Sequence, residues 1–131
     1  MNIPISGTSQ PTILIVENEV SNRILIERVL STRGYRCLSA SHGREALDIL
    51  DHEQVDLILT DLSMPVLDGY RTTQLIRARP GLAKVPIVAV TAYALGDENE
   101  AAMQIGCTEY LTKPFKPRQL LEVVDRLLPQ H

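Results

Sequence analysis

Five short apolar runs, set apart by stretches with helical periodicity, constrain the fold of this chain more than any other feature. Residues 12–16 read TILIV, a β-branched run typical of a strand that is buried on both faces. Residues 55–60 and 86–90 have the same character, and weaker candidates for strands lie at residues 35–40 and 108–111. The sequence therefore predicts five strands.

Helical patterns follow the predicted strands. The clearest covers residues 117–128, where a proline suits the first turn and apolar residues recur on one face at Leu120, Val123, Val124 and Leu127. The other predicted helices cover residues 20–33, 44–52, 69–79 and 96–105. Gly34 is expected to cap the first of these. The alternation indicates an α/β fold, in which helices cover both faces of a parallel sheet through right-handed crossovers.

The length and charge of the chain limit its class. With 131 residues it can form one domain, which we expect at residues 12–131 after a flexible leader at residues 1–11. A net charge of -3 argues against general binding to nucleic acids or membranes, which favours basic surfaces. The sequence has no signal peptide and no apolar run of the ~18 residues that a membrane helix needs, so we expect a cytoplasmic protein.

Polar side chains follow four of the predicted strands where those strands end. They are Glu17, Asn18 and Glu19 after the first strand, Asp61 after the third, Thr91 after the fourth, and Thr112 and Lys113 after the fifth. Because the carboxyl ends of parallel strands meet at one edge of a sheet, we expect these side chains to converge. Taken singly, each has a structural interpretation, such as a helix cap or a surface lysine. Their occurrence together at four strand ends favours a functional site.

The residue types at these strand ends favour phosphoryl chemistry with a metal ion. Clustered carboxylates recruit a hard cation, and a small set of oxygen ligands suits Mg²⁺. A central carboxylate such as Asp61 can act as a nucleophile towards phosphorus. The metal and the ammonium group of Lys113 would then neutralise the transferring oxygens, and a nearby hydroxyl could donate to the new phosphoryl group.

The chain resembles the receiver domains of response regulators, the chemotaxis-regulator-like modules of two-component signalling. The resemblance covers residues 12–128. The matching stretches are ILIVENEVSNR at 13–23, GREALDIL at 43–50, VDLILTDLSMPVLDGY at 55–70, PIVAVTAYA at 86–94 and EYLTKPF at 109–115. It implies a flavodoxin-like (βα)5 fold with a five-stranded parallel sheet of order 2-1-3-4-5.

The resemblance also implies roles for individual residues. Asp61 would be the phosphoacceptor, and Lys113 would pair with the phosphoryl group. Thr91 would be the switch hydroxyl that moves towards that group, and Tyr110 would be the aromatic residue that turns inward with it. The peptide bond between Lys113 and Pro114 would be cis, a conformation that proline makes accessible.

The metal site implied by the resemblance departs from the family pattern at one position. Glu17, Asn18 and Asp61, with the backbone carbonyl of Ser63, would hold Mg²⁺, but receivers usually carry a second acid where this chain has Asn18. An amide oxygen can still bind Mg²⁺ without bringing a formal charge. We therefore expect weakened Mg²⁺ binding and either weaker phosphorylation or none, unless the neighbouring Glu19 compensates.

The implied function is that of a signalling phosphoacceptor that catalyses only its own phosphorylation and dephosphorylation. A histidine kinase or a histidine phosphotransfer protein would donate the phosphoryl group. The modified domain would then bind a target protein through its fourth helix, fifth strand and fifth helix, at about residues 96–128. No output domain follows in the sequence, so the output would be protein binding, or the receiver is cut from a larger chain.

Two other functional classes compete with this interpretation. A pseudo-receiver, which binds partners regardless of phosphorylation, is favoured by Asn18 and disfavoured by the presence of Asp61, Thr91 and Lys113. A flavin carrier or a phosphatase of the same layout fits less well. The segment ENEVSN after the first strand is acidic and would repel phosphate, and no second acid lies two residues after Asp61.

Overall fold

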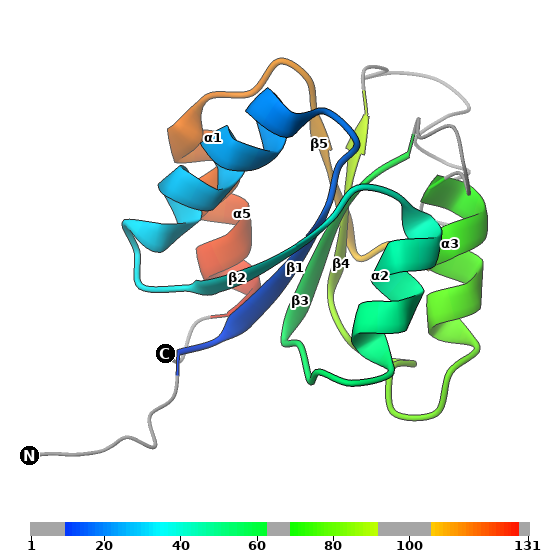
Figure 1. The fold of residues 1–131 in the computed structure, drawn as a ribbon. Coiled ribbons are helices and arrows are strands. Elements are labelled where there is room, and N and C mark those ends of the chain that lie inside the picture. The colour runs from blue at the N-terminus through cyan, green and yellow to red at the C-terminus, as the bar shows by residue number, and fades with distance from the viewer. Residues whose placement is uncertain (1–9, 63–68, 92–105, 129–131) are drawn as a thin grey trace, which may run out of the picture.

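Strands and helices alternate along the chain in a computed structural model, which describes residues 10–62, 69–91 and 106–128 (Figure 1). The elements are β1 (Thr12–Val16), α1 (Val20–Ser31), β2 (Arg36–Ala40), α2 (Gly43–Leu50), β3 (Leu57–Asp61), α3 (Gly69–Arg77), β4 (Ile87–Thr91), β5 (Glu109–Thr112) and α5 (Pro117–Leu127). All strand pairs are parallel, and the order in the sheet is β2-β1-β3-β4-β5. The predicted fold class and strand order are thus confirmed.

The core lies on both faces of the sheet. Every residue of β1, β3 and β4 is buried, as the apolar residues that dominate these strands predict. Because side chains alternate along a strand, Ile13 and Ile15 pack into one cluster and Leu14 into another. The first cluster contains residues of α1 and α5, and the second contains residues of α2 and α3. Figure 1 shows these two helix pairs on opposite sides of the sheet, as the sequence predicts.

The ends of several elements differ from their predicted positions. Asp61 and Thr91 are the last residues of β3 and β4, where the sequence placed them just beyond the strands. Helix α1 ends at Ser31, followed by Thr32, and Gly34 closes the end of the helix as predicted. Gly34 adopts a positive φ of 87°, its N–H donates to the carbonyl of Ser31 at 3.0 Å, and the N–H of Tyr35 donates to the carbonyl of Leu30 at 3.4 Å.

Three predicted features lie wholly or partly outside the described residues. The helix predicted at 96–105 and Ser63 fall in the gaps of the described chain, and so does most of the leader. Pro11, which the leader was expected to include, already belongs to the fold, because its carbonyl accepts a hydrogen bond from the Arg36 N–H at 2.9 Å. Of the helices that the structure describes, none combines the length and the apolar character required to cross a membrane.

Backbone hydrogen bonds between neighbouring segments fix the edge of the sheet where the strands end. The N–H of Glu17 donates to the carbonyl of Ala40 at 3.0 Å, and the N–H of Lys113 donates to the carbonyl of Thr91 at 2.7 Å. Leu62 likewise donates to the carbonyl of Val90 at 3.1 Å. The residues that leave β1, β3 and β5 are therefore held in register with the strands beside them.

Candidate functional site

One ammonium group joins two buried carboxylates at the carboxyl edge of the sheet. Lys113 Nζ donates to Asp61 Oδ2 at 2.9 Å and to Glu17 Oε1 at 3.3 Å. Asp61 is 6% exposed and Glu17 is 2% exposed. In the sheet, β5 lies two strands from β3 and three from β1, and the long side chain of Lys113 spans this distance from the end of β5 to both acids. The structure thus brings together three of the predicted site residues.

The electrostatics of this triad keep the lysine charged. Burial opposes the charge of Lys113, but the hydrogen bonds and charges of Asp61 and Glu17 outweigh that effect and raise the pKa of the ammonium group. Two carboxylates that share one ammonium group retain a net negative charge when both are ionised. Since buried charge of one sign is costly, the triad favours a cation or another group that carries positive charge.

Glu17 is fixed by hydrogen bonds at both ends of its backbone and at its carboxylate. Its N–H donates to Ala40, and its carbonyl accepts from Arg23 Nη1 at 2.7 Å. Its Oε2 accepts from the backbone N–H of Glu19 at 3.0 Å, while Oε1 accepts from Lys113. The carboxylate is therefore oriented by groups on both sides of the site.

Asn18 and Glu19 lie in the turn between β1 and α1, and both are exposed. Glu19 is the residue that precedes the first turn of α1, and its backbone N–H donates to Glu17 Oε2. Among the residues that the structure describes, no contact of the Glu19 carboxylate with the site supports the compensation that the sequence left open. Asn18 remains the residue next to Glu17 that could supply an additional oxygen.

The remaining predicted residues occupy distinct positions. Thr91, at the end of β4, is 2% exposed, and its carbonyl binds the backbone of Lys113. The Lys113–Pro114 peptide bond is cis, as predicted. Tyr110, on β5, is 39% exposed, and the inward turn that the resemblance implies for it on phosphorylation stays a prediction.

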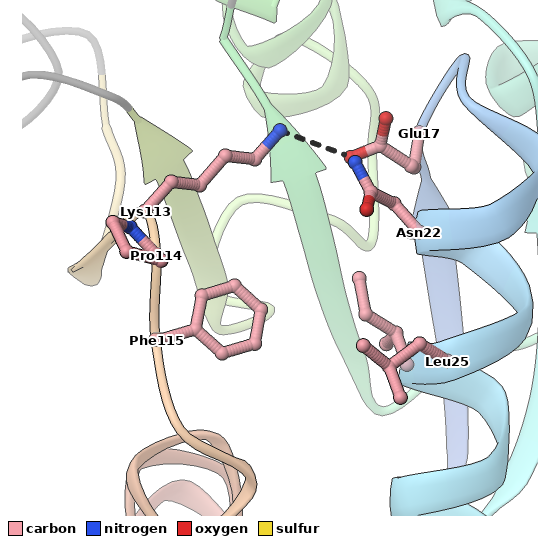
Figure 2. A pocket seen from close by; sticks show the side chains of 7 residues that line it. Glu17, Asn22, Leu25, Lys113, Pro114 and Phe115 are labelled. Carbon is pink, nitrogen blue, oxygen red and sulfur yellow. Dashed lines mark hydrogen bonds and ion pairs between the residues drawn. The ribbon is translucent and has the colours of Figure 1, made fainter.

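A cavity of about 400 Å³ adjoins the triad between α1 and the segment that leads from β5 to α5. Figure 2 shows Lys113 reaching across its upper end to Glu17, with Phe115 and Leu25 on opposite walls. The cavity is lined by Glu17, Asn22, Leu25, Ile26, Lys113, Pro114 and Phe115. Sequence reasoning missed Arg23 and this cavity, although Asn22, Arg23 and Phe115 lie within stretches that match the family.

The donor set at this edge fits a hard divalent cation. The side chains available are two carboxylates and the amide of Asn18, all of which present oxygen atoms. Within the part of the chain that the structure describes, no cluster of three or more acidic, histidine or cysteine side chains could hold a metal. Among the described residues, the acidic side chains that Lys113 joins at this edge are Glu17 and Asp61, and these supply the negative charge for a cation.

A family model and many known proteins match this chain. The model described as the response regulator receiver domain matches residues 13–125. Sensor histidine kinase GacS of Pseudomonas protegens is 39% identical over 118 residues, which cover 87% of this chain and 13% of the kinase. Sensor histidine kinase RcsC of Escherichia coli is 38% identical over 124 residues, which cover 95% of this chain and 12% of the kinase. The chain thus spans only a small part of these relatives.

Solved structures of similar fold include a receiver domain and a chemotaxis response regulator. The receiver domain of sensor histidine kinase PA1611 from Pseudomonas aeruginosa is 38% identical, with a TM-score of 0.85 over 93% of this chain and 100% of that one. Its structure has a magnesium ion coordinated in the active site cleft. The chemotaxis response regulator CheY4 of Vibrio cholerae is 28% identical, with a TM-score of 0.87 over 91% of this chain and 99% of that one.

Proposed function

We propose that this chain, which belongs to the response regulator receiver domain family, accepts a phosphoryl group on Asp61 and thereby switches a protein-binding surface. The observation that carries the proposal is the 2.9 Å contact between Lys113 Nζ and Asp61 Oδ2 at the carboxyl edge of the sheet. A buried aspartate paired in this way presents one oxygen as a nucleophile while the ammonium group stays beside the reacting centre. The chain would act on itself alone rather than on a separate substrate.

The transfer follows from the positions of these groups. An oxygen of Asp61 attacks the phosphorus of a phosphohistidine, so that a P–O bond forms while the P–N bond breaks and the imidazole leaves with the electron pair. Lys113 neutralises charge on the phosphoryl oxygens, and the hydroxyl of Thr91 donates a hydrogen bond to one of them. When bound, Mg²⁺ would add charge neutralisation at the same oxygens. Glu17, Asn18 and Asp61 would hold the metal, together with the Ser63 carbonyl.

The pseudo-receiver alternative depends on Asn18 alone. The Lys113–Asp61 contact and the buried position of Thr91 favour the phosphoacceptor, because a domain that ignored phosphorylation would need neither. Asn18 bears on the strength of metal binding rather than on the presence of the nucleophile. We therefore propose that Mg²⁺ binds, with an affinity lower than a carboxylate at position 18 would give.

Intact mass after incubation with acetyl phosphate and Mg²⁺ tests this proposal. We expect the protein to gain the mass of one phosphoryl group, and we expect Asp61→Asn to gain none. Chelation of Mg²⁺ by EDTA should also prevent the gain. An unmodified wild-type protein at saturating Mg²⁺ would instead support the pseudo-receiver.

The donor is proposed to be a protein because α1 presents an exposed apolar surface beside the site. Val20 is 55% exposed, Ile24 is 43% exposed and Leu25 is 55% exposed. Of the described residues, the other large apolar side chain that is exposed is Tyr110, on β5. Clustered apolar exposure of this kind marks protein contacts. We assign the α1 surface to the phosphohistidine donor, and the surface around β5 and α5 to the downstream target.

The double substitution Val20→Ser and Ile24→Ser should separate a protein donor from a small one. Loss of two apolar contacts should slow transfer from a phosphorylated histidine phosphotransfer protein by about tenfold. The rate with acetyl phosphate should stay within about twofold, because a small donor does not need the α1 surface. Equal slowing with both donors would show that the substitutions disturb the site itself.

A further inference from the structure

Arg23 closes the first turn of α1, and its guanidinium group contacts the site at a backbone carbonyl. Its Nη1 donates to the carbonyl of Glu17 at 2.7 Å, and its own N–H donates to the carbonyl of Glu19 at 3.0 Å. The side chain is half-buried. Arg23 therefore spans the turn between β1 and α1 from its start to its end.

The carbonyl that Arg23 binds belongs to the peptide group joining Glu17 to Asn18. A peptide group is planar, so fixing its oxygen also fixes the direction in which the chain continues to Asn18. Among the described residues, the other contacts of Glu17 hold its N–H and its carboxylate, not this peptide group. The bond from Arg23 thus controls the part of the turn from which Asn18 projects.

We propose that Arg23 is a positioning residue for the divalent cation, because it holds the Glu17–Asn18 peptide so that the amide oxygen of Asn18 can bind the metal. The inference rests on the proposed function, in which Mg²⁺ binds at this turn. A carboxylate at position 18 would be drawn to the cation by its charge, whereas a neutral amide is drawn less strongly. If the turn is already ordered, binding of Mg²⁺ does not have to supply the free energy of ordering it. This saving matters more for the amide of Asn18 than for a carboxylate, because the amide attracts the cation less strongly.

The charge of Arg23 and its hydrogen bond to Glu17 have opposite effects on the affinity for Mg²⁺. A guanidinium group near a divalent cation repels it, so removing the charge alone would tighten Mg²⁺ binding. Removing a group that orders the ligands would weaken binding. The sign of the change in affinity therefore distinguishes a positioning role from a purely electrostatic one.

Isothermal titration of the full chain with Mg²⁺ tests the inference in Arg23→Met, which can neither donate a hydrogen bond nor carry a charge. We expect its Kd for Mg²⁺ to rise by roughly tenfold. Arg23→Lys, which keeps the charge and one donor group, should have a Kd between those of the wild type and Arg23→Met. Arg28→Met, at an exposed arginine of the same helix, should bind Mg²⁺ like the wild type.

Tighter or unchanged Mg²⁺ binding in Arg23→Met would overturn the inference. Urea unfolding in EDTA identifies a merely structural role, because such a role would lower stability while leaving the Kd of the folded protein unchanged. In an Asn18→Ala background, the effect of Arg23→Met on Kd should shrink, and an undiminished effect would exclude action through Asn18. A wild-type chain that binds no Mg²⁺ would overturn the metal part of the proposed function as well. Normal wild-type binding with unaffected Arg23 variants overturns only the role of Arg23.

Discussion

Replacing Asn18 with aspartate will tighten Mg²⁺ binding by roughly thirtyfold, which corresponds to about 2 kcal/mol. The substitution restores a formal charge at the turn between β1 and α1, where the described residues offer a cation only the carboxylates of Glu17 and Asp61. The size of the effect follows from a direct ligand contact in a largely solvated site, because Asn18 is exposed. Titration calorimetry gives the Kd directly. The Mg²⁺ concentration that half-saturates phosphorylation by acetyl phosphate should fall in parallel.

A matched control separates metal ligation from a general increase in negative charge. Ser21→Asp adds the same charge three residues later, at an exposed position in the first turn of α1. We expect it to change the Kd by less than about threefold, because a charge outside the ligand shell is screened by water. Similar Kd values for Asn18→Asp and Ser21→Asp would show that residue 18 does not bind the metal.

The fold could be predicted from the sequence because its central strands are buried on both faces. Burial on both faces requires continuous apolar runs, and the runs at β1, β3 and β4 are visible without any alignment. The last residue of such a strand is harder to predict from the sequence. Asp61 belongs to β3 because Leu62, the next residue, still donates to the carbonyl of Val90, and such a backbone contact has no signature in residue type.

The site could be predicted only as far as side-chain chemistry reveals it. Asp61, Glu17 and Lys113 are ionisable residues at strand ends, so the topology alone brings them together. Arg23 binds a backbone carbonyl, and every residue has one, so no complementary side chain in the sequence marks this contact. The cavity beside the triad likewise depends on Phe115 and Leu25, which lie on facing walls because α1 packs beside α5 (Figure 2).

Lys113→Met will lower the free energy of unfolding by about 2 kcal/mol at neutral pH in EDTA. The substitution keeps an unbranched side chain that is one atom shorter, but it leaves Asp61 and Glu17 without their shared ammonium group, and these side chains are only 7% and 3% exposed. Removing one partner of a fully buried ion pair lowers the free energy of unfolding by more than this. We expect a smaller loss here because the side chain of Lys113 is 28% exposed. Urea unfolding measures the loss, and Lys84→Met, at an exposed lysine, should change stability by less than about 0.5 kcal/mol.

Three further measurements test whether charge is the cause of the loss in Lys113→Met. Asp61→Asn introduced into Lys113→Met should recover part of the stability, because it removes one of the two facing charges. Mg²⁺ should stabilise Lys113→Met more than the wild type, since the cation can replace the missing ammonium group.

The pH dependence of stability provides the third measurement. The pKa of Lys113 is raised in the folded protein, so the stability that its charge contributes is complete below the unfolded value of 10.5 and is lost as the pH rises through the folded value. The difference in stability between the wild type and Lys113→Met should therefore persist at neutral pH and shrink above about pH 10.5. A loss that neither Asp61→Asn nor Mg²⁺ offsets would mean that Lys113 contributes through packing and not through its charge.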